Sequence, residues 1–193
     1  YITQNSRYPI LAEESGKSED NLGDTYWVVD PLDGTANYKR DIPFCCVSIG
    51  LVNKMKPLVG VIYDFNNDDL YLGNNLEKKA MLNNDPISVS NVDKKKDGIL
   101  ITGLPHNTDY SDEALNNMIK DMQSWKKLRM IGSAAMASCY VACGKGDLYK
   151  ENGIYIWDVL AGAAIIESAG GTAKIFNIQD NHQVDVIFSN SKI

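Results

Sequence analysis

Two aspartates, Asp30 and Asp33, follow an apolar run and are separated by Pro31 and Leu32. Pro31 fixes its own φ angle and makes the chain turn, so the two carboxylates can point into one small volume. Two negative charges that close together repel each other unless a cation lies between them. The spacing therefore predicts a cation site, although an Asx turn that ends a strand would use the same residues.

The residues that follow could hold an anion beside such a cation. Gly34 and Thr35 come next, where we expect a helical turn to begin, and the first N–H groups of a helix have no intrahelical acceptor. A phosphate group can bind to such N–H groups. The Leu32 carbonyl would face the same cavity, and the Thr35 hydroxyl could orient a water molecule. This stretch therefore indicates a metal ion beside a bound phosphate.

Further acidic residues stand at the edges of other apolar elements. Glu13 and Glu14 follow the segment YPILA, and Asp158 lies in the first turn of a helix of apolar and small residues. Carboxylates and carbonyls are hard oxygen ligands, which suit Mg²⁺ or Mn²⁺. His106 and His182 lie in polar stretches, so we expect them to be exposed loop residues. Asp158 has an alternative explanation, because an acidic residue in the first turn can cap a helix or offset its dipole.

The composition is that of an ordinary globular protein. The chain has 193 residues, 44% of them hydrophobic and 23% charged, and a net charge of −6. Its one basic run, Lys94 to Lys96, lies beside Asp93 and Asp97, so we expect no broad basic face for nucleic acid. No apolar run approaches the ~20 residues that a membrane-spanning helix needs. The four cysteines lack zinc-finger spacing and are expected to be reduced core thiols of a cytoplasmic protein.

Short apolar segments separated by turns predict an antiparallel meander in the first half of the chain. We expect strands at 26–30, ended by Pro31, at 44–52, 58–64 and 70–74, a turn within 81–90, and a strand at 98–103.

The second half alternates strands with helices, which predicts a mixed or parallel sheet covered on both faces. We expect helices at 111–125 (N-cap Ser111), 133–146 and 157–171, and strands at 127–132, 146–151, 172–176 and 184–190. A boundary at 103–107 would give an N-terminal α+β domain, residues 1–105, and a C-terminal α/β domain, residues 106–193.

Three segments together resemble the inositol monophosphatase family of lithium-sensitive, magnesium-dependent phosphomonoesterases. They are EES at 13–15, DPLDGTAN at 30–37 and WDVLAGAAIIESAGG at 157–171. The family's first signature is Asp-Pro-(Ile/Leu)-Asp-Gly-Thr-x-Asn, and its second runs from Trp-Asp-x-x-(Ala/Gly)-Gly to Glu-Ala-Gly-Gly. Here the second ends in ESAGG at 167–171, one residue longer. The order and separation of the segments also fit, and the resemblance covers essentially the whole chain.

The resemblance implies roles for matching residues. The metal ligands would be Glu13, Asp30 (bridging two ions), the Leu32 carbonyl, Asp33 and Asp158. They would hold two or three Mg²⁺ ions, with Mn²⁺ as an alternative. One ion would activate a water that Thr35 and Glu13 orient, and a second would stabilise the leaving alkoxide. The implied catalytic residues are therefore Glu13, Thr35 and Asp33.

The resemblance also implies a substrate site. Its residues would be Leu32, Asp33, Gly34, Thr35, Arg129, Gly132, Ser133, Ala134, Glu151 and Asp158. Gly34 and Thr35 would bind the phosphate through N–H groups, Gly132 to Ala134 would line the sugar or inositol side, and Glu151 would accept hydrogen bonds from substrate hydroxyls. Glu151 could instead be an exposed turn residue, and Arg129 a structural or interface ion pair. A bulky Tyr155 near the expected pocket leaves the substrate open.

The implied activity is hydrolysis of a phosphate monoester, inositol 1-phosphate or a similar polyol phosphate. Alternatives on the same fold are fructose-1,6-bisphosphatase, 3′-phosphoadenosine-5′-phosphate phosphatase and histidinol-phosphate phosphatase. An alternative from another class is a regulatory protein that binds partners in transcription or ribosome maturation, because some bacterial members resemble extragenic suppressor proteins. The implied fold is a layered αβαβα sandwich of the sugar phosphatase type, classed as α+β or α/β and usually a homodimer. We expect the family's N-terminal helical segment to be missing from this chain, which begins at Tyr1.

Overall fold

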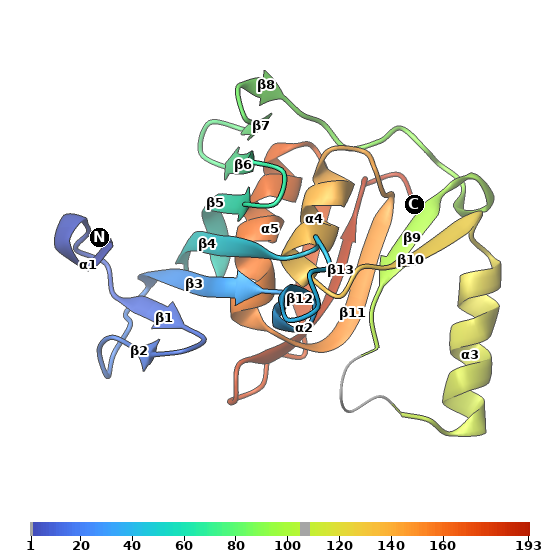
Figure 1. Ribbon diagram of the computed structural model, residues 1–193, viewed down its shortest axis with the longest axis horizontal. Coiled ribbons are helices and arrows are strands. Elements are labelled where there is room, and N and C mark those ends of the chain that lie inside the picture. Colours follow the sequence, from blue (N-terminus) through green and yellow to red (C-terminus); the bar gives the residue numbers. More distant parts are fainter. Residues whose placement is uncertain (1, 105–108) are drawn as a thin grey trace.

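Two mixed β-sheets with helices between them form the structure, a computed structural model that describes residues 2–104 and 109–193. Helices α4 (Ala134–Ala142) and α5 (Ile156–Ser168) lie between the sheets, and α3 (Asp112–Gln123) lies beside the second sheet, away from them (Figure 1). The architecture is therefore a layered α+β sandwich, as expected. The short helices are α1 (Ile2–Asn5), α2 (Thr35–Tyr38) and the 3₁₀ helix η1 (Lys95–Asp97).

The first sheet has the strand order β2-β1-β3-β4-β5-β6-β7-β8. Its strands are β1 (Ile10–Ala12), β2 (Gly16–Lys17), β3 (Thr25–Asp33), β4 (Cys46–Asn53), β5 (Lys56–Asp64), β6 (Asp69–Asn74), β7 (Lys79–Leu82) and β8 (Asp85–Pro86). From β3 to β8 each strand pairs antiparallel with the next, which confirms the predicted meander. Strand β1, which pairs parallel with β3, was not predicted because it is only 3 residues long.

The prediction that Pro31 ends the first long strand was wrong. Strand β3 continues to Asp33, and its register with β4 shifts between Asp30 and Asp33. This irregularity lets a residue without an N–H group lie within the strand but outside the hydrogen-bonded ladder. In a regular strand, residues three apart point to opposite faces. Because of the shift, Asp30 and Asp33 are both buried while Pro31 is exposed.

The second sheet has the order β10-β9-β11-β13-β12. Its strands are β9 (Ile99–Thr102), β10 (Lys127–Met130), β11 (Leu148–Tyr155), β12 (Thr172–Phe176) and β13 (Gln183–Ser189). β9 pairs parallel with β10 and β11, whereas β13 pairs antiparallel with β11 and β12. The predicted mixed sheet is therefore confirmed, with β11 extending four residues beyond the predicted end at 151.

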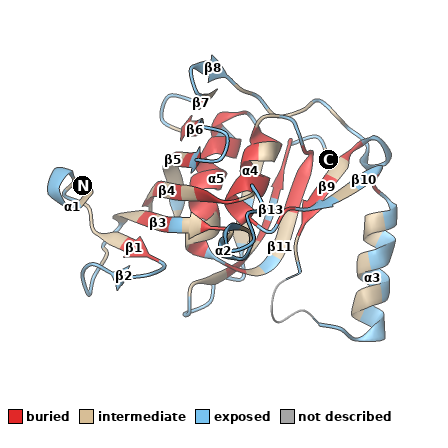
Figure 2. Cartoon of the chain, viewed as in Figure 1, coloured by how far each residue is buried: buried red, intermediate tan, exposed pale blue. Residues whose placement is uncertain are grey.

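Small residues allow α5 to pack directly on the first sheet. A Cβ built on Gly60 of β5 would lie 2.1 Å from the Ala161 carbonyl oxygen, and one on Gly73 of β6 would lie 2.4 Å from the Ile165 Cα atom. Most of α4 and α5 is buried (Figure 2). This close packing fixes the position of α5, and therefore of its N-terminal residues, relative to the first sheet.

The predicted N-cap of α3 and the predicted glycine end of α5 agree with the structure, whereas α4 ends at Ala142, before the predicted end at 146. The Ser111 side chain accepts a hydrogen bond from the Ala114 N–H at 3.3 Å, as an N-cap residue does. After α5, Gly170 has a φ of 89° and closes the helix end in the left-handed conformation.

The expected domain boundary at 103–107 overlaps residues 105–108, which lie outside the described residues, as does His106. Strand β9 precedes this boundary but belongs to the second sheet, so the division at residue 105 stays a proposal. His182 was expected to be exposed but is half-buried, with its ring centroid 5.9 Å from that of Trp157. Across residues 2–104 and 109–193, no helix is long and apolar enough to cross a membrane.

Candidate metal and phosphate site

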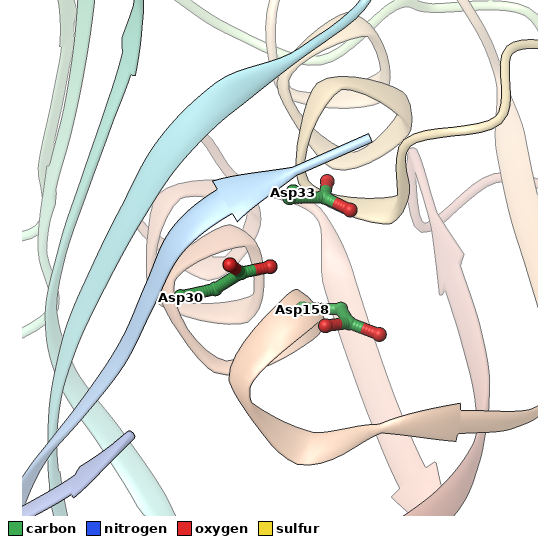
Figure 3. Close-up of side chains that lie close together, drawn as sticks. All are labelled: Asp30, Asp33 and Asp158. Carbon is green, nitrogen blue, oxygen red and sulfur yellow. The ribbon is translucent and has the colours of Figure 1, made fainter. Parts of the chain in front are cut away.

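Three aspartates from distant parts of the chain converge between the sheets. Asp30 and Asp33 lie on the last part of β3, and Asp158 lies in the first turn of α5 (Figure 3). One carboxylate oxygen from each lies within 4.8 Å of the others. The predicted convergence of Asp30 with Asp33 is therefore observed, and Asp158 joins them.

Each of these carboxylates is held by the fold through one named oxygen. Asp30 Oδ1 accepts the Leu32 N–H at 2.8 Å, and Asp158 Oδ2 accepts the Tyr155 N–H at 3.1 Å. Asp33 Oδ2 accepts the Ser133 hydroxyl at 2.5 Å and the Ala135 N–H at 2.8 Å. The Asx-turn and helix-capping interpretations are thus both present. These contacts use one named oxygen of each side chain.

Burial raises the pKa of all three carboxylates, and repulsion within the group raises the pKa of Asp30 and Asp158 further. Burial first, and then the charge of Asp33, raises the pKa of both Asp30 and Asp158. The pKa of Asp33 is raised to about 6, chiefly by burial. In the described part of the chain the ion pairs are Lys54–Asp24, Lys95–Asp121 and Lys150–Asp121, none of which neutralises the cluster. A divalent cation would remove this repulsion, and three carboxylates are ligands that Mg²⁺ accepts.

Glu13 lies beside this cluster because β1 runs parallel to β3. Ala12 is opposite Val29, and the Glu13 N–H donates to the Val29 carbonyl at 3.2 Å, so Glu13 is placed next to Asp30. Partial burial of its carboxylate, followed by the charge of Asp30, raises the pKa of Glu13 to about 7. Glu13 is exposed and lies outside the group of three. The structure therefore places it at the open edge of the site.

The segment after Asp33 forms the expected helical turn, α2. Gly34 has a φ of 85°, and a Cβ there would lie 2.5 Å from the Phe44 carbonyl oxygen, so only glycine fits. The Thr35 hydroxyl donates to the Leu32 carbonyl at 3.0 Å. This bond fixes the hydroxyl near the carbonyl that was predicted to bind metal, and leaves its oxygen free to accept from a water molecule.

The Gly132–Ala134 segment meets this turn through a residue that the sequence analysis overlooked. The Asn37 side-chain amide donates to the carbonyls of Phe44 (2.8 Å), Ile131 (2.8 Å) and Gly132 (3.2 Å). Asn37 belongs to the DPLDGTAN motif, so its position in the motif was the available signal. Ser133, expected to contact substrate, is buried and has its hydroxyl on Asp33.

Glu151 and Arg129 have different surroundings. Glu151 is half-buried on β11, and its Oε2 accepts the Tyr149 hydroxyl at 2.9 Å. Its charge is one of the causes that raise the Asp33 pKa, after burial. Arg129 is exposed on β10, where its guanidinium donates to the Leu128 carbonyl at 2.8 Å.

Comparison with known families identifies the class of protein that carries this site. The model of the inositol monophosphatase family matches residues 3–192, nearly the whole chain. The chain belongs to the inositol monophosphatase family.

Individual members of the inositol monophosphatase family agree with this assignment. An inositol monophosphatase of Mesembryanthemum crystallinum is 43% identical over 75% of this chain and 54% of its own length. The Nus factor SuhB of Pasteurella multocida is 36% identical over 88% of this chain and 64% of its own. The chain thus spans between about half and two thirds of these curated relatives.

A solved structure supports the same fold. The inositol monophosphatase of Anabaena (Nostoc) sp. PCC 7120 superposes with a TM-score of 0.90 at 36% identity and covers 100% of this chain and 77% of its own. The layered sandwich and its buried acidic cluster are therefore features of a chain that belongs to a metal-dependent family.

Proposed function

We propose that this protein is a Mg²⁺-dependent phosphatase that hydrolyses a phosphate monoester to an alcohol and inorganic phosphate. The observation that carries the proposal is the group of Asp30, Asp33 and Asp158. One oxygen from each lies within 4.8 Å of the others, no ion pair within residues 2–104 and 109–193 neutralises them, and the Gly34–Thr35 turn follows directly. Such a group of like charges requires a cation, and the turn offers N–H groups to a phosphate beside it.

The aspartates, the Leu32 carbonyl and Glu13 are the residues that would hold the metal. Their oxygen donors fit two or three Mg²⁺ ions, and Mn²⁺ accepts the same donors. When bound, the metal supplies an activated water and offsets the charge of the leaving oxygen.

The chain's own residues supply positioning. The N–H groups of Gly34 and Thr35 would hold the phosphate, and the Thr35 hydroxyl, fixed by the Leu32 carbonyl, would orient the attacking water together with Glu13. Phosphoryl transfer depends mainly on positioning and charge neutralisation, so it needs no nucleophilic Ser, Cys or His.

A polyol monophosphate, such as inositol 1-phosphate, is the substrate class that we favour. Glu151 offers a partly buried carboxylate to substrate hydroxyls, and its charge acts on Asp33. Relatives named inositol monophosphatase and inositol-1-monophosphatase support this choice. Arg129, Gly132 and Ala134 remain proposed contacts on the side of the alcohol.

Phosphate release from a panel of substrates tests this function. The panel contains inositol 1-phosphate, fructose 1,6-bisphosphate, 3′-phosphoadenosine-5′-phosphate and histidinol phosphate, each with Mg²⁺ and with EDTA. We expect Mg²⁺-dependent release that is fastest with inositol 1-phosphate and is lost in Asp158→Asn. Asparagine can still accept the Tyr155 N–H, so α5 stays capped in the variant. The absence of release from every compound, with metal bound, would contradict the proposal.

A regulatory role is the second candidate, because two relatives named Nus factor SuhB align with 88% and 92% of this chain. Cellular rescue by Asp158→Asn would favour this role over catalysis.

We also propose a homodimer in the cytoplasm. The free thiols of Cys45, Cys46, Cys139 and Cys143 support a reducing compartment, and sedimentation would test the dimer.

A further inference from the structure

A buried tyrosine holds the carboxylate of Glu151. Tyr149 and Glu151 are two residues apart on β11, so both side chains point to the same face of the sheet. The Tyr149 hydroxyl donates to Glu151 Oε2 at 2.9 Å. The Tyr149 side chain is 1% exposed and packs edge-on against Phe188, with ring centroids 6.0 Å apart. Tyr149 therefore has a fixed position and is not itself accessible to a substrate.

A glycine directly after the neighbouring strand leaves room for the same carboxylate. Gly103 follows β9, which pairs with β11 so that Thr102 lies opposite Lys150. A Cβ built on Gly103 would lie 2.3 Å from Glu151 Oε1 and 2.4 Å from Oε2. The carboxylate therefore rests on the bare backbone of Gly103, and any larger residue there would displace it.

The contacts of Glu151 leave it able to bind hydroxyl groups. In the part of the chain that the structure describes, Tyr149 is the donor recorded for Glu151, and it occupies Oε2 alone. A half-buried carboxylate has capacity for further donors, and an alcohol with several hydroxyls can supply them. An aryl phosphate without hydroxyls cannot. A carboxylate fixed in this way would therefore select between the two classes.

We propose that Tyr149 and Gly103 are positioning residues that fix Glu151 to receive the hydroxyls of a polyol phosphate, an inference that rests on the proposed function. The Tyr149 hydroxyl fixes the orientation of the carboxylate through its hydrogen bond, and the absence of a side chain at Gly103 leaves the space that the carboxylate occupies. Selectivity for polyols then depends on two residues that do not contact the substrate.

The test compares kcat and KM for inositol 1-phosphate and p-nitrophenyl phosphate, using the protein with Mg²⁺. The ratio is kcat/KM for inositol 1-phosphate divided by kcat/KM for p-nitrophenyl phosphate. For Tyr149→Phe we expect this ratio to fall about tenfold, since a hydrogen bond to a charged group is lost. Gly103→Ala should lower the same ratio, because its Cβ moves only the end of the flexible Glu151 side chain. The matched control is Tyr71→Phe, which removes a hydroxyl from an equally buried tyrosine on β6 of the other sheet and should leave the ratio unchanged.

A double variant separates positioning from a general structural effect. If Tyr149 acts through Glu151, then Tyr149→Phe should lower the ratio no further once Glu151→Ala is present. Equal losses on both substrates, or an additive loss in the double variant, would overturn the inference while leaving the phosphatase function intact. If the unaltered protein hydrolysed neither p-nitrophenyl phosphate nor inositol 1-phosphate, the result would contradict the proposed function, and this inference with it.

Discussion

The Ser133 hydroxyl donates to Asp33 Oδ2 at 2.5 Å, although the two residues are 100 positions apart in the chain. Ser133 is also the N-cap of α4, where it accepts the Met136 N–H at 3.2 Å. The beginning of a central helix thus orients an aspartate at the end of a strand. Through this contact, α4 takes part in shaping the candidate metal site.

Ser133→Ala should weaken Mg²⁺ binding about tenfold, because partners that orient metal ligands typically contribute 10- to 100-fold in affinity. The Ala135 N–H would still hold Asp33 Oδ2, so the fold should be retained. Calorimetric titration with Mg²⁺ measures the effect. Ser138→Ala is the matched control, since Ser138 is a buried serine of α4 whose hydroxyl donates to the Ala134 carbonyl. Equal Mg²⁺ affinity in the two variants would contradict the role of Ser133.

Removal of Mg²⁺ should destabilise the protein more at high pH than at low pH. The pKa values of Glu13 and Asp33 are raised to about 7 and about 6, above the ordinary carboxyl values of about 4 in an unfolded chain. Between about pH 4 and the raised pKa values, the metal-free folded state therefore binds more protons than the unfolded state. The stability that these bound protons contribute is lost as the pH rises through 6 to 7.

Metal binding has the opposite dependence, because only deprotonated carboxylates bind the ion. The difference in Tm between samples with Mg²⁺ and with EDTA should thus increase from about pH 5 to about pH 8. Thermal unfolding by fluorescence measures it. A difference that stays constant, or that is larger at low pH, would show that these carboxylates do not bind the metal.

Asn37→Asp should lower the free energy of unfolding by about 2–4 kcal/mol, because it places an oxygen opposite carbonyls that the Asn37 amide now joins. Urea denaturation measures the loss. The same change at Asn181, in an exposed turn, serves as the control and should alter stability by less than about 0.5 kcal/mol. If the two variants were equally stable, Asn37 would not connect α2 to the Ile131–Gly132 segment.

Gly60→Ala should destabilise the protein by about 3 kcal/mol or more, because the added Cβ would overlap the Ala161 carbonyl of α5. Gly50→Ala provides a graded comparison, since its Cβ would lie 3.1 Å from the Ala161 nitrogen and the helix needs to move less. Urea denaturation of both should rank Gly60→Ala as the less stable. The reverse order would mean that α5 does not rest on β5 as closely as the structure indicates.

Features that depend on residues close together in the chain could be predicted from the sequence. The meander strands follow from short apolar segments separated by turns, and the start of α3 follows from Ser111. The convergence of Asp30 with Asp33 was predicted from an expected turn at Pro31, whereas the structure achieves it by a shift of register within a strand that continues through the proline.

Contacts between distant segments could not be predicted in the same way. The bond from Ser133 to Asp33 depends on where the start of α4 lies relative to the end of β3, and the place of Glu13 depends on the short parallel strand β1. The contact from Tyr149 to Glu151 has a local signal in their spacing along β11, but the part of Gly103 depends on the pairing of β9 with β11.

The turnover of Asp33→Asn with inositol 1-phosphate at saturating Mg²⁺ tests the central claim most directly. Asparagine can still accept from Ser133 and Ala135, so the variant removes the charge and a metal ligand while keeping the fold. We predict that kcat falls about a thousandfold, because a bound metal contributes several kcal/mol to stabilising the transition state. Asp85→Asn, the same change on the exposed strand β8, should keep kcat within about twofold. An unchanged kcat in Asp33→Asn would show that the three aspartates are not the catalytic metal site.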